Sequence, residues 1–282
     1  MMYFRPKVLI KSALLVIIGL IVATQSYANL LISPVRSVLS ERDRTQVITL
    51  INTGNQTRSY RVEWRQLMAV PDGGYREYTE EEKKRIAGLE KIVRVTPKQV
   101  SLQPGQRQSV KILLRKPEGL AEGEYRSHLS FVALPLHSAQ ENNQGETSLK
   151  LQLLMSYSMP VIYRTGSVIV NPEITNLSLV HIKESGVTNI KVDLYHDDLF
   201  STHGRLVATW TPKNGTPREV GLLNGYNFYP ETKNATIQFP WKDFKLAPGS
   251  LEVRYEGQGE YQGLLLAQKT LTITQQMIDS VK

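Results

Sequence analysis

The chain has 282 residues, no cysteine, 41% hydrophobic residues and a formal net charge of +8. The lack of cysteine excludes disulfides, thiol catalysis and thiolate metal sites. The basic excess is mild and spread along the chain without a dense Lys/Arg run, which gives almost no support to nucleic-acid binding.

Residues 1–28 have the pattern of a secretory signal peptide. Three basic residues precede an apolar run at 13–23, and Ser26-Tyr27-Ala28 has the small-x-small form of a cleavage site. An uncleaved anchor is the alternative. We expect a mature chain that begins near Asn29, leaves the cytoplasm and contains no membrane span.

The part of the chain from residue 29 to 165 is predicted to be rich in strands. Side chains alternate between apolar and polar in segments that Gly, Pro and Asn interrupt, which is typical of strands. The predicted strands are 30–39, 46–52, 59–65, a pair or more within 92–115, 125–134 and 147–164. A charged helical stretch at 80–89 is expected to be a surface excursion. This order indicates an antiparallel β-sandwich.

A second β-sandwich is predicted for residues 166–282, after a hinge at Thr165-Gly166-Ser167. Its strands are expected at 174–182, 188–195, 205–211, 218–223, 235–239, 251–255 and 264–273. The fold class is therefore all-β, with two sandwich domains.

The strand predicted at 147–164 is about three times as long as a typical strand. Apolar residues occupy every second position, and the first four are Leu149, Leu151, Leu153 and Met155. These four either belong to an ordinary core strand or are held ready for another chain. Both interpretations remain open on the pattern alone.

Arg36 is a single cation within an otherwise apolar and small-residue segment. It is either an outward-facing surface arginine or a partly buried guanidinium that binds a carboxylate, because arginine bonds that group through two nitrogens.

Other candidate chemistry is weak. The chain has no Gly-x-Ser-x-Gly motif. Residues His196, Asp197 and Asp198, with His203 nearby, are better explained as a polar turn than as a metal site, since adjacent strand residues point to opposite sides. The segment 257–260 (GQGE) is interpreted as a hairpin rather than a phosphate loop. We therefore expect no catalytic residue, metal or cofactor, and no enzyme activity.

Residues 95–106 (VTPKQVSLQPGQ) resemble the TP-x-x-V-x-L-x-PG-x-x-Q signature of the PapD-like periplasmic pilus-assembly chaperones. Residues 123–135 resemble the next strand of that family, and residues 160–164 the end of its first domain. The resemblance covers about residues 30–164 well and the second domain weakly. It implies two immunoglobulin-like sandwiches at an angle, a periplasmic location, and binding of pilus subunits by donor-strand complementation before delivery to an outer-membrane usher.

The resemblance also implies residue roles. It makes Leu149, Leu151, Leu153 and Met155 the donor residues that fill the groove of a subunit. It gives Arg36 the role of binding the C-terminal carboxylate of the subunit.

The same resemblance places Arg164 and Glu124 near a salt-bridge network that joins the two domains. One departure is that the family's cleft lysine aligns with Pro160, and no lysine lies between Ser156 and Arg164. Another cation assists Arg36, or the subunit terminus is held differently.

Three further questions stay open at this stage. A PapD-like module could instead serve as an interaction or scaffold domain of the cell envelope, unconnected with pili. An exported enzyme is the least supported alternative, because no reacting groups are arranged for it. Self-association of the free chain through its donor segment is also left open.

Overall fold

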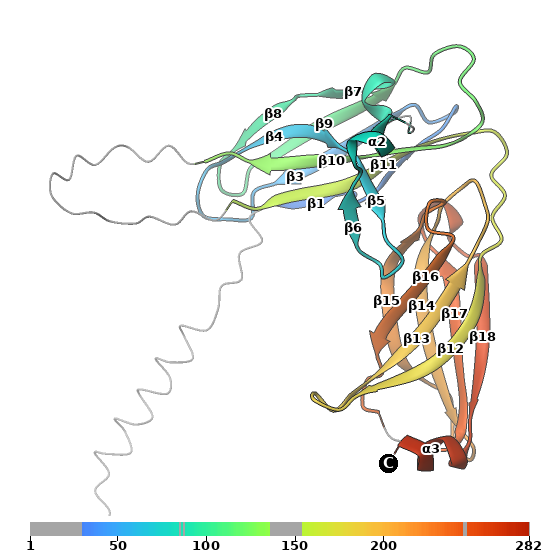
Figure 1. The fold of residues 1–282 in the computed structure, drawn as a ribbon. Helices are drawn as coiled ribbons and strands as arrows, with labels where there is room; N and C mark the ends of the chain where they lie inside the picture. The colour runs from blue at the N-terminus through green and yellow to red at the C-terminus, as the bar shows by residue number, and fades with distance from the viewer. Residues whose placement is uncertain (1–29, 85, 87, 136–153, 245–246, 282) are drawn as a thin grey trace, which may run out of the picture.

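The computed structural model describes residues 30–84, 86, 88–135, 154–244 and 247–281. These residues form two β-sandwiches that lie at an angle to each other (Figure 1). The all-β prediction with two sandwiches is confirmed. No helix within the described ranges is long and apolar enough to cross a membrane. The signal-peptide prediction, residues 1–28, falls outside them.

The first sandwich pairs a sheet of order β1-β3-β9-β7 with a sheet of order β2-β11-β10-β4-β8. The first sheet corresponds to strands A, B, E and D of an immunoglobulin-like sandwich, and β4, β10 and β11 of the second sheet correspond to strands C, F and G. Strands β2 and β8 are added at the two edges of the second sheet. The strands are β1 (Leu31–Ser33), β2 (Ser37–Leu39), β3 (Thr45–Ile51), β4 (Arg58–Arg65), β7 (Val93–Thr96), β8 (Gln99–Leu102), β9 (Arg107–Leu114), β10 (Gly123–Ala133) and β11 (Ser156–Thr165).

Alternation along these strands builds the core of the first sandwich. In β9, Val110, Ile112 and Leu114 are buried, whereas Lys111 and Leu113 face outward. Phe131 of β10 belongs to the same core. Burial of this apolar face is what holds the two sheets together.

The second sandwich consists of a sheet of order β12-β13-β16 and a sheet of order β15-β14-β17-β18. Its strands are β12 (Glu173–Ile182), β13 (Val187–Tyr195), β14 (Thr202–Pro212), β15 (Arg218–Phe228), β16 (Asn234–Pro240), β17 (Gly249–Gly257) and β18 (Leu265–Ile273). All seven predicted strands are confirmed. In the core, the Trp210 and Trp241 rings pack edge to face with centroids 5.3 Å apart. Helix α3 (Gln275–Val281) follows β18 and buries Ile278.

Two predicted elements of the first sandwich differ from the structure, and a third lies partly outside the described residues. The segment 30–39 forms two short strands in different sheets, because the chain crosses between the sheets after Pro34. The helical stretch is only α2 (Glu80–Lys83), capped by Thr79, with the 3₁₀ turn η1 (Leu89–Lys91) following. The long strand is described only from Ser156 onward.

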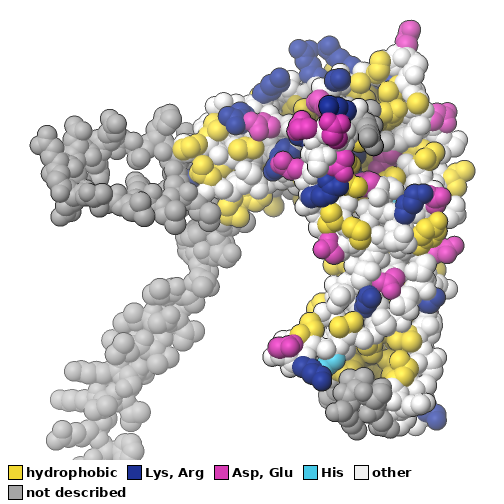
Figure 2. All heavy atoms as spheres, in the orientation of Figure 1, with side chains coloured by type: hydrophobic (Ala, Val, Ile, Leu, Met, Phe, Trp, Pro, Cys, Tyr) yellow, Lys and Arg dark blue, Asp and Glu magenta, His cyan; other side chains and the backbone are white. Residues whose placement is uncertain are grey.

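A hairpin between β4 and α2 was not predicted from the sequence. Strands β5 (Leu67–Ala69) and β6 (Tyr75–Glu77) are joined by a turn that contains Gly73 at a φ of 90°. The hairpin reaches down to the second sandwich (Figure 1), where the Thr236 backbone nitrogen donates to the Pro71 carbonyl oxygen at 2.8 Å. Acidic and basic side chains lie side by side over the upper part of the molecule (Figure 2). Arg76 of β6 forms an ion pair with Glu82 of α2.

Candidate functional site: the cleft between the sandwiches

Arg36 lies where the chain crosses from one sheet to the other, between β1 and β2. Its side chain is only 8% exposed, so it is not an outward-facing surface arginine. Strand β2 pairs with β11 in parallel, with Ser37 opposite Val161 and Leu39 opposite Tyr163. This short parallel contact ties Arg36 to the middle of β11.

The guanidinium of Arg36 is only half satisfied. Its Nη1 donates to both carboxylate oxygens of Glu260 in the second sandwich, each at 2.8 Å. Its Nε and Nη2 are buried and make no hydrogen bond with the described residues. Because Nε and Nη2 form one edge of the planar guanidinium, that edge can bind a second carboxylate through two parallel hydrogen bonds.

Arg164 contacts the same glutamate but has every nitrogen partnered. Nε donates to Glu124 at 2.9 Å, Nη1 to Glu260 at 2.9 Å, and Nη2 to the Ser201 carbonyl oxygen at 2.7 Å. The Ser201 backbone nitrogen also donates to Glu124, at 2.9 Å. Glu124 and Arg164 are opposite residues of β10 and β11 and therefore pair within the first sandwich, whereas Ser201 and Glu260 link it to the second. We call Arg36, Arg164, Glu124, Ser201 and Glu260 the cleft junction.

The charges of the cleft junction sum to zero, with two arginines against two glutamates. Burial alone would raise the pKa of Glu260, but Arg36 and Arg164 outweigh it and hold that pKa below its ordinary value. Glu260 is therefore ionised at neutral pH and holds Arg36 by its Nη1 side.

Strand β11 has an unpaired edge next to Arg36. On one side it pairs with β10 from Ser156 to Thr165, and on the other side β2 covers only Val161–Tyr163. Within the described ranges, no strand pairs with residues 156–160 on the side of β2. An unpaired edge of this kind is a template for a strand from another chain.

The apolar side chains of β11 change from buried to exposed along the strand. Met159 and Tyr163 are buried in the core of the first sandwich, and Tyr157 packs against it. Met155 precedes the strand and is 47% exposed. The other predicted donor residues, Leu149, Leu151 and Leu153, lie outside the described residues.

The residues considered as a metal site bring only two side chains together, since His196 Nδ1 lies 3.6 Å from Asp198 Oδ2. His196 Nε2 lies 3.0 Å from the Tyr229 carbonyl oxygen, and Asp197 forms an ion pair with Lys233. Asp198 accepts a hydrogen bond from the Asn171 backbone nitrogen at 2.8 Å. The described residues contain no group of three or more metal-ligating side chains.

Sequence reasoning missed the second-sandwich side of the cleft. The hairpin predicted at 257–260 joins β17 to β18 through the 3₁₀ turn η2 (Gly259–Tyr261), which carries Glu260. Glu260 and Arg36 are 224 positions apart, so no local pattern could have paired them. Ser201 gave no signal either, because its contacts with Arg164 and Glu124 exist only in the folded chain.

A second junction lies beneath the β5–β6 hairpin. Arg126 of β10 forms a close ion pair with Glu231 and donates to the Leu67 carbonyl oxygen at 3.0 Å. Its guanidinium carbon lies 3.6 Å from the centre of the Tyr229 ring. Glu231 also accepts from the Ala69 backbone nitrogen at 3.0 Å. We call Arg126, Glu231, Tyr229 and the β5–β6 hairpin the hairpin junction.

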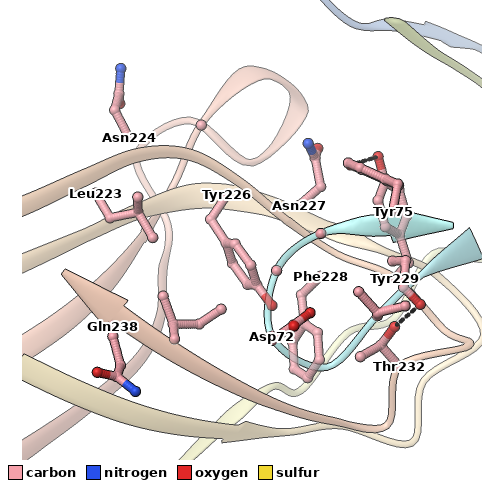
Figure 3. Close-up of a pocket in the computed structure, with 16 residues that line it drawn as sticks. Asp72, Tyr75, Leu223, Asn224, Tyr226, Asn227, Phe228, Tyr229, Thr232 and Gln238 are labelled. Atoms are coloured by element: carbon pink, nitrogen blue, oxygen red, sulfur yellow. Dashed lines mark hydrogen bonds between the residues drawn. The ribbon is translucent and has the colours of Figure 1, made fainter. Parts of the chain in front are cut away.

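A pocket separates the tip of this hairpin from β15. Figure 3 shows Tyr226 and Asp72 across the pocket from each other, and Tyr75 meeting Tyr229 through their hydroxyl groups. The Oδ1 atom of Asn227 in its wall is buried and makes no hydrogen bond with the described residues. Asn227 is the β15 partner of His203 in β14, so the pocket wall continues toward the cleft.

No protein-family model and no curated protein matches the sequence. Among solved structures, the chain is similar to the Pseudomonas aeruginosa CupB2 chaperone, with 11% identity over 86% of this chain and 99% of that one and a TM-score of 0.44. It is similar to the periplasmic chaperone SfaE, with 12% identity over 86% of this chain and 98% of that one and a TM-score of 0.42. A chain of the complex between the Salmonella enterica SafA pilin and the SafB chaperone matches with 13% identity over 89% of this chain and 98% of that one and a TM-score of 0.42.

Proposed function

We propose that this protein is a periplasmic chaperone that binds pilus or fimbrial subunits by donor-strand complementation and delivers them to an outer-membrane usher. The observation that carries the proposal is the unpaired edge of β11, which ends at the half-satisfied guanidinium of Arg36. The resemblance of residues 95–106 to the PapD-like signature supports the same function.

The geometry defines how a subunit strand would dock. A strand added beside residues 156–160 would occupy the position that β2 occupies beside Val161–Tyr163. If it runs parallel to β11, as β2 does, its C-terminus faces Arg36, and Nε and Nη2, which have no partner among the described residues, can donate to the terminal carboxylate. Backbone hydrogen bonds would then complete the sheet and also cap the edge of the subunit.

Apolar burial is the main source of affinity in this proposal. Leu149, Leu151, Leu153 and Met155 continue the odd-numbered positions of β11, and full burial would contribute about 1.5–3 kcal/mol for each large apolar side chain. The upper limit is about 6–12 kcal/mol before ordering costs are subtracted. The carboxylate contact mostly fixes the register, since a slip of one residue turns every donor side chain away from the groove.

The proposal is tested by co-expressing the chain with a fimbrial subunit and measuring how much subunit is recovered with it from the periplasm. Replacing both Leu151 and Leu153 by Asp should abolish recovery, because charged side chains cannot enter an apolar groove. The control is Leu154→Asp, which places one such charge, in place of two, in the same segment at an even-numbered position. It should leave recovery unchanged.

Circular dichroism and thermal unfolding should show that all these variants remain folded. Full recovery of the subunit with the double Asp variant would overturn the donor role. Co-purification of a complete, stable envelope protein in place of an incomplete subunit would favour the scaffold alternative.

A further inference from the structure

His203 lies on the second-sandwich side of the cleft, where the charges of both Arg36 and Glu260 act on it. It belongs to β14, and its carbonyl oxygen accepts from the Gln258 backbone nitrogen at 2.9 Å. A Cβ atom added to Gly259 would lie 3.6 Å from His203 Cδ2, so the start of η2, the turn that carries Glu260, lies beside the imidazole ring. The Nδ1 atom of His203 is buried and makes no hydrogen bond with the described residues.

Charge balance gives this histidine a part in the cleft. The two arginines and two glutamates of the cleft junction already neutralise each other. A ligand carboxylate on the Nε and Nη2 edge of Arg36 would leave one uncompensated negative charge in a largely buried site. Such a charge is costly unless a cation is supplied. A proton on His203 is a local source of that cation.

We infer that His203 is the second cationic group of the carboxylate site, and that a ligand with a free C-terminal carboxylate binds together with one proton taken up by this imidazole. The inference rests on the proposed function, because it deepens the carboxylate site of Arg36. In this inference, His203 of the second sandwich takes the place of the cleft lysine that the PapD-like family has where this chain has Pro160.

The groups around His203 set the direction of the pH dependence. Burial, followed by the charge of Arg36, lowers the pKa of His203. Glu260, the Asn227 side chain and the Tyr226 carbonyl oxygen raise that pKa by a smaller amount. In the free protein the imidazole is therefore neutral at neutral pH. A bound carboxylate raises the pKa, so the complex takes up a proton and binding tightens as the pH falls.

The test uses the mature chain and a pair of short synthetic peptides with alternating apolar residues and no histidine. One peptide ends in a free carboxylate and the other in an amide. Affinities are measured by isothermal titration calorimetry from about pH 8 to about pH 5.5. Buffers of different ionisation enthalpy report the protons taken up. The acid peptide should bind the wild-type chain up to about tenfold more tightly at the lower pH, which corresponds to one pKa unit.

His203→Gln keeps a polar side chain that does not titrate. It should retain the preference for the acid peptide over the amide but lose both the rise in affinity at low pH and the proton uptake. His203→Asn is a second variant, and thermal unfolding checks both. His181→Gln, at a histidine that contacts Thr188 in the other sheet of the second sandwich, is the matched control and should behave like the wild type.

The outcomes separate the two claims. If His203→Gln keeps the wild-type pH profile and proton uptake while the acid peptide is still preferred, the role of His203 is wrong and the carboxylate site stands. If the wild-type chain binds the acid and amide peptides equally at every pH, the carboxylate site fails, and the proposed function loses its anchor.

Discussion

Two ion-pair junctions join the sandwiches in the described part of the chain, and they differ in how far their hydrogen bonds are satisfied. At the hairpin junction, Arg126 donates from Nη1 to Glu231 and from Nη2 to the Leu67 carbonyl oxygen. Its guanidinium also stacks on the Tyr229 ring. At the cleft junction, Arg164 is fully partnered, whereas Arg36 keeps one buried edge that has no partner among the described residues.

This difference separates the arginines that hold the two sandwiches together from the arginine that is free to bind a ligand. Buried polar groups in folded proteins are nearly always hydrogen-bonded, because an unsatisfied one costs about 1–3 kcal/mol. Arg126 and Arg164 follow that rule and therefore fix how the sandwiches meet. Arg36 departs from it at the place where β11 becomes unpaired, and such a departure is expected where a ligand supplies the missing partner. The comparison predicts that stability depends on the satisfied arginines and function on the unsatisfied one.

The largest expected effect comes from removing Arg164. Arg164→Ala leaves Glu124, whose side chain is 3% exposed, without its cation, and breaking a buried pair in this way costs about 3–5 kcal/mol. The urea midpoint should fall accordingly. Arg205→Ala is the matched control, because that arginine pairs with Glu256 while 48% exposed, and it should change stability by less than about 1 kcal/mol. Equal losses in the two variants would contradict the structural role of Arg164.

His128 provides a pH test of the hairpin junction. Its ring lies 5.1 Å from that of Tyr75 at an edge-on angle, and both ring nitrogens are buried without a hydrogen bond to the described residues. Burial, followed by the charges of Arg126 and Arg65, lowers the pKa of His128 to about 3. The unfolded chain takes up this proton near pH 6.5. The contribution of the neutral His128 to the free energy of unfolding is therefore fully present above that pH and is lost as the pH falls toward about 3.

We expect the free energy of unfolding to fall by up to about 1.4 kcal/mol per pH unit below 6.5 because of this histidine, hence by about 2 kcal/mol at pH 5. His128→Gln should flatten the stability profile between those pH values. His181→Gln should leave the slope of the wild type. Urea unfolding at a series of pH values measures both variants, and an unchanged slope in His128→Gln would show that His128 is not the group that titrates.

Glu231 tests the hairpin junction at neutral pH with a smaller expected effect. Glu231→Ala removes the carboxylate shared by Arg126 and the Ala69 backbone nitrogen, but Arg126 keeps Tyr229 and the Leu67 carbonyl oxygen. We expect a loss of about 1–2 kcal/mol, and faster amide hydrogen exchange in β5 and β6. Glu63→Ala, at an exposed pair with Arg61, is the control. Unchanged exchange in the hairpin would mean that Glu231 does not hold it.

The sequence was informative where structure repeats with a short period. The seven strands of the second sandwich and the alternation of β9 follow from a period of two, because one face of each strand is buried. The β5–β6 hairpin escaped prediction because its strands have three residues each and are held by the second sandwich rather than by alternation.

The same limit applies to the cleft. Arg36 could be singled out because a lone cation in an apolar segment is unusual. The segment left open whether its side chain is exposed, and the folded chain shows it to be only 8% exposed. Its partner Glu260 could not be singled out, because an acidic residue in a glycine-rich hairpin has no local signature. The charge balance that gives His203 its proposed role exists only once both sandwiches are in place.

The smallest expected effect on stability is that of Arg36→Ala, although its side chain is as buried as that of Arg126. The variant loses the hydrogen bonds from Nη1 to Glu260. It also removes two buried donors that no described residue satisfies, so the two contributions of about 1–3 kcal/mol oppose each other. Glu260 still has Arg164 as its counter-ion. We expect a change in the free energy of unfolding of less than about 1 kcal/mol.

Recovery of a co-expressed subunit with Arg36→Ala should nevertheless fall to background, because the carboxylate that fixes the register of the docked strand has lost its partner. Arg36→Lys sharpens the test, since lysine keeps the charge but cannot form two parallel hydrogen bonds. It should recover only part of the subunit. If Arg36→Ala instead lowered stability as much as Arg164→Ala, Arg36 would belong with the supporting arginines. The distinction between the satisfied and the unsatisfied edge would then carry no functional meaning.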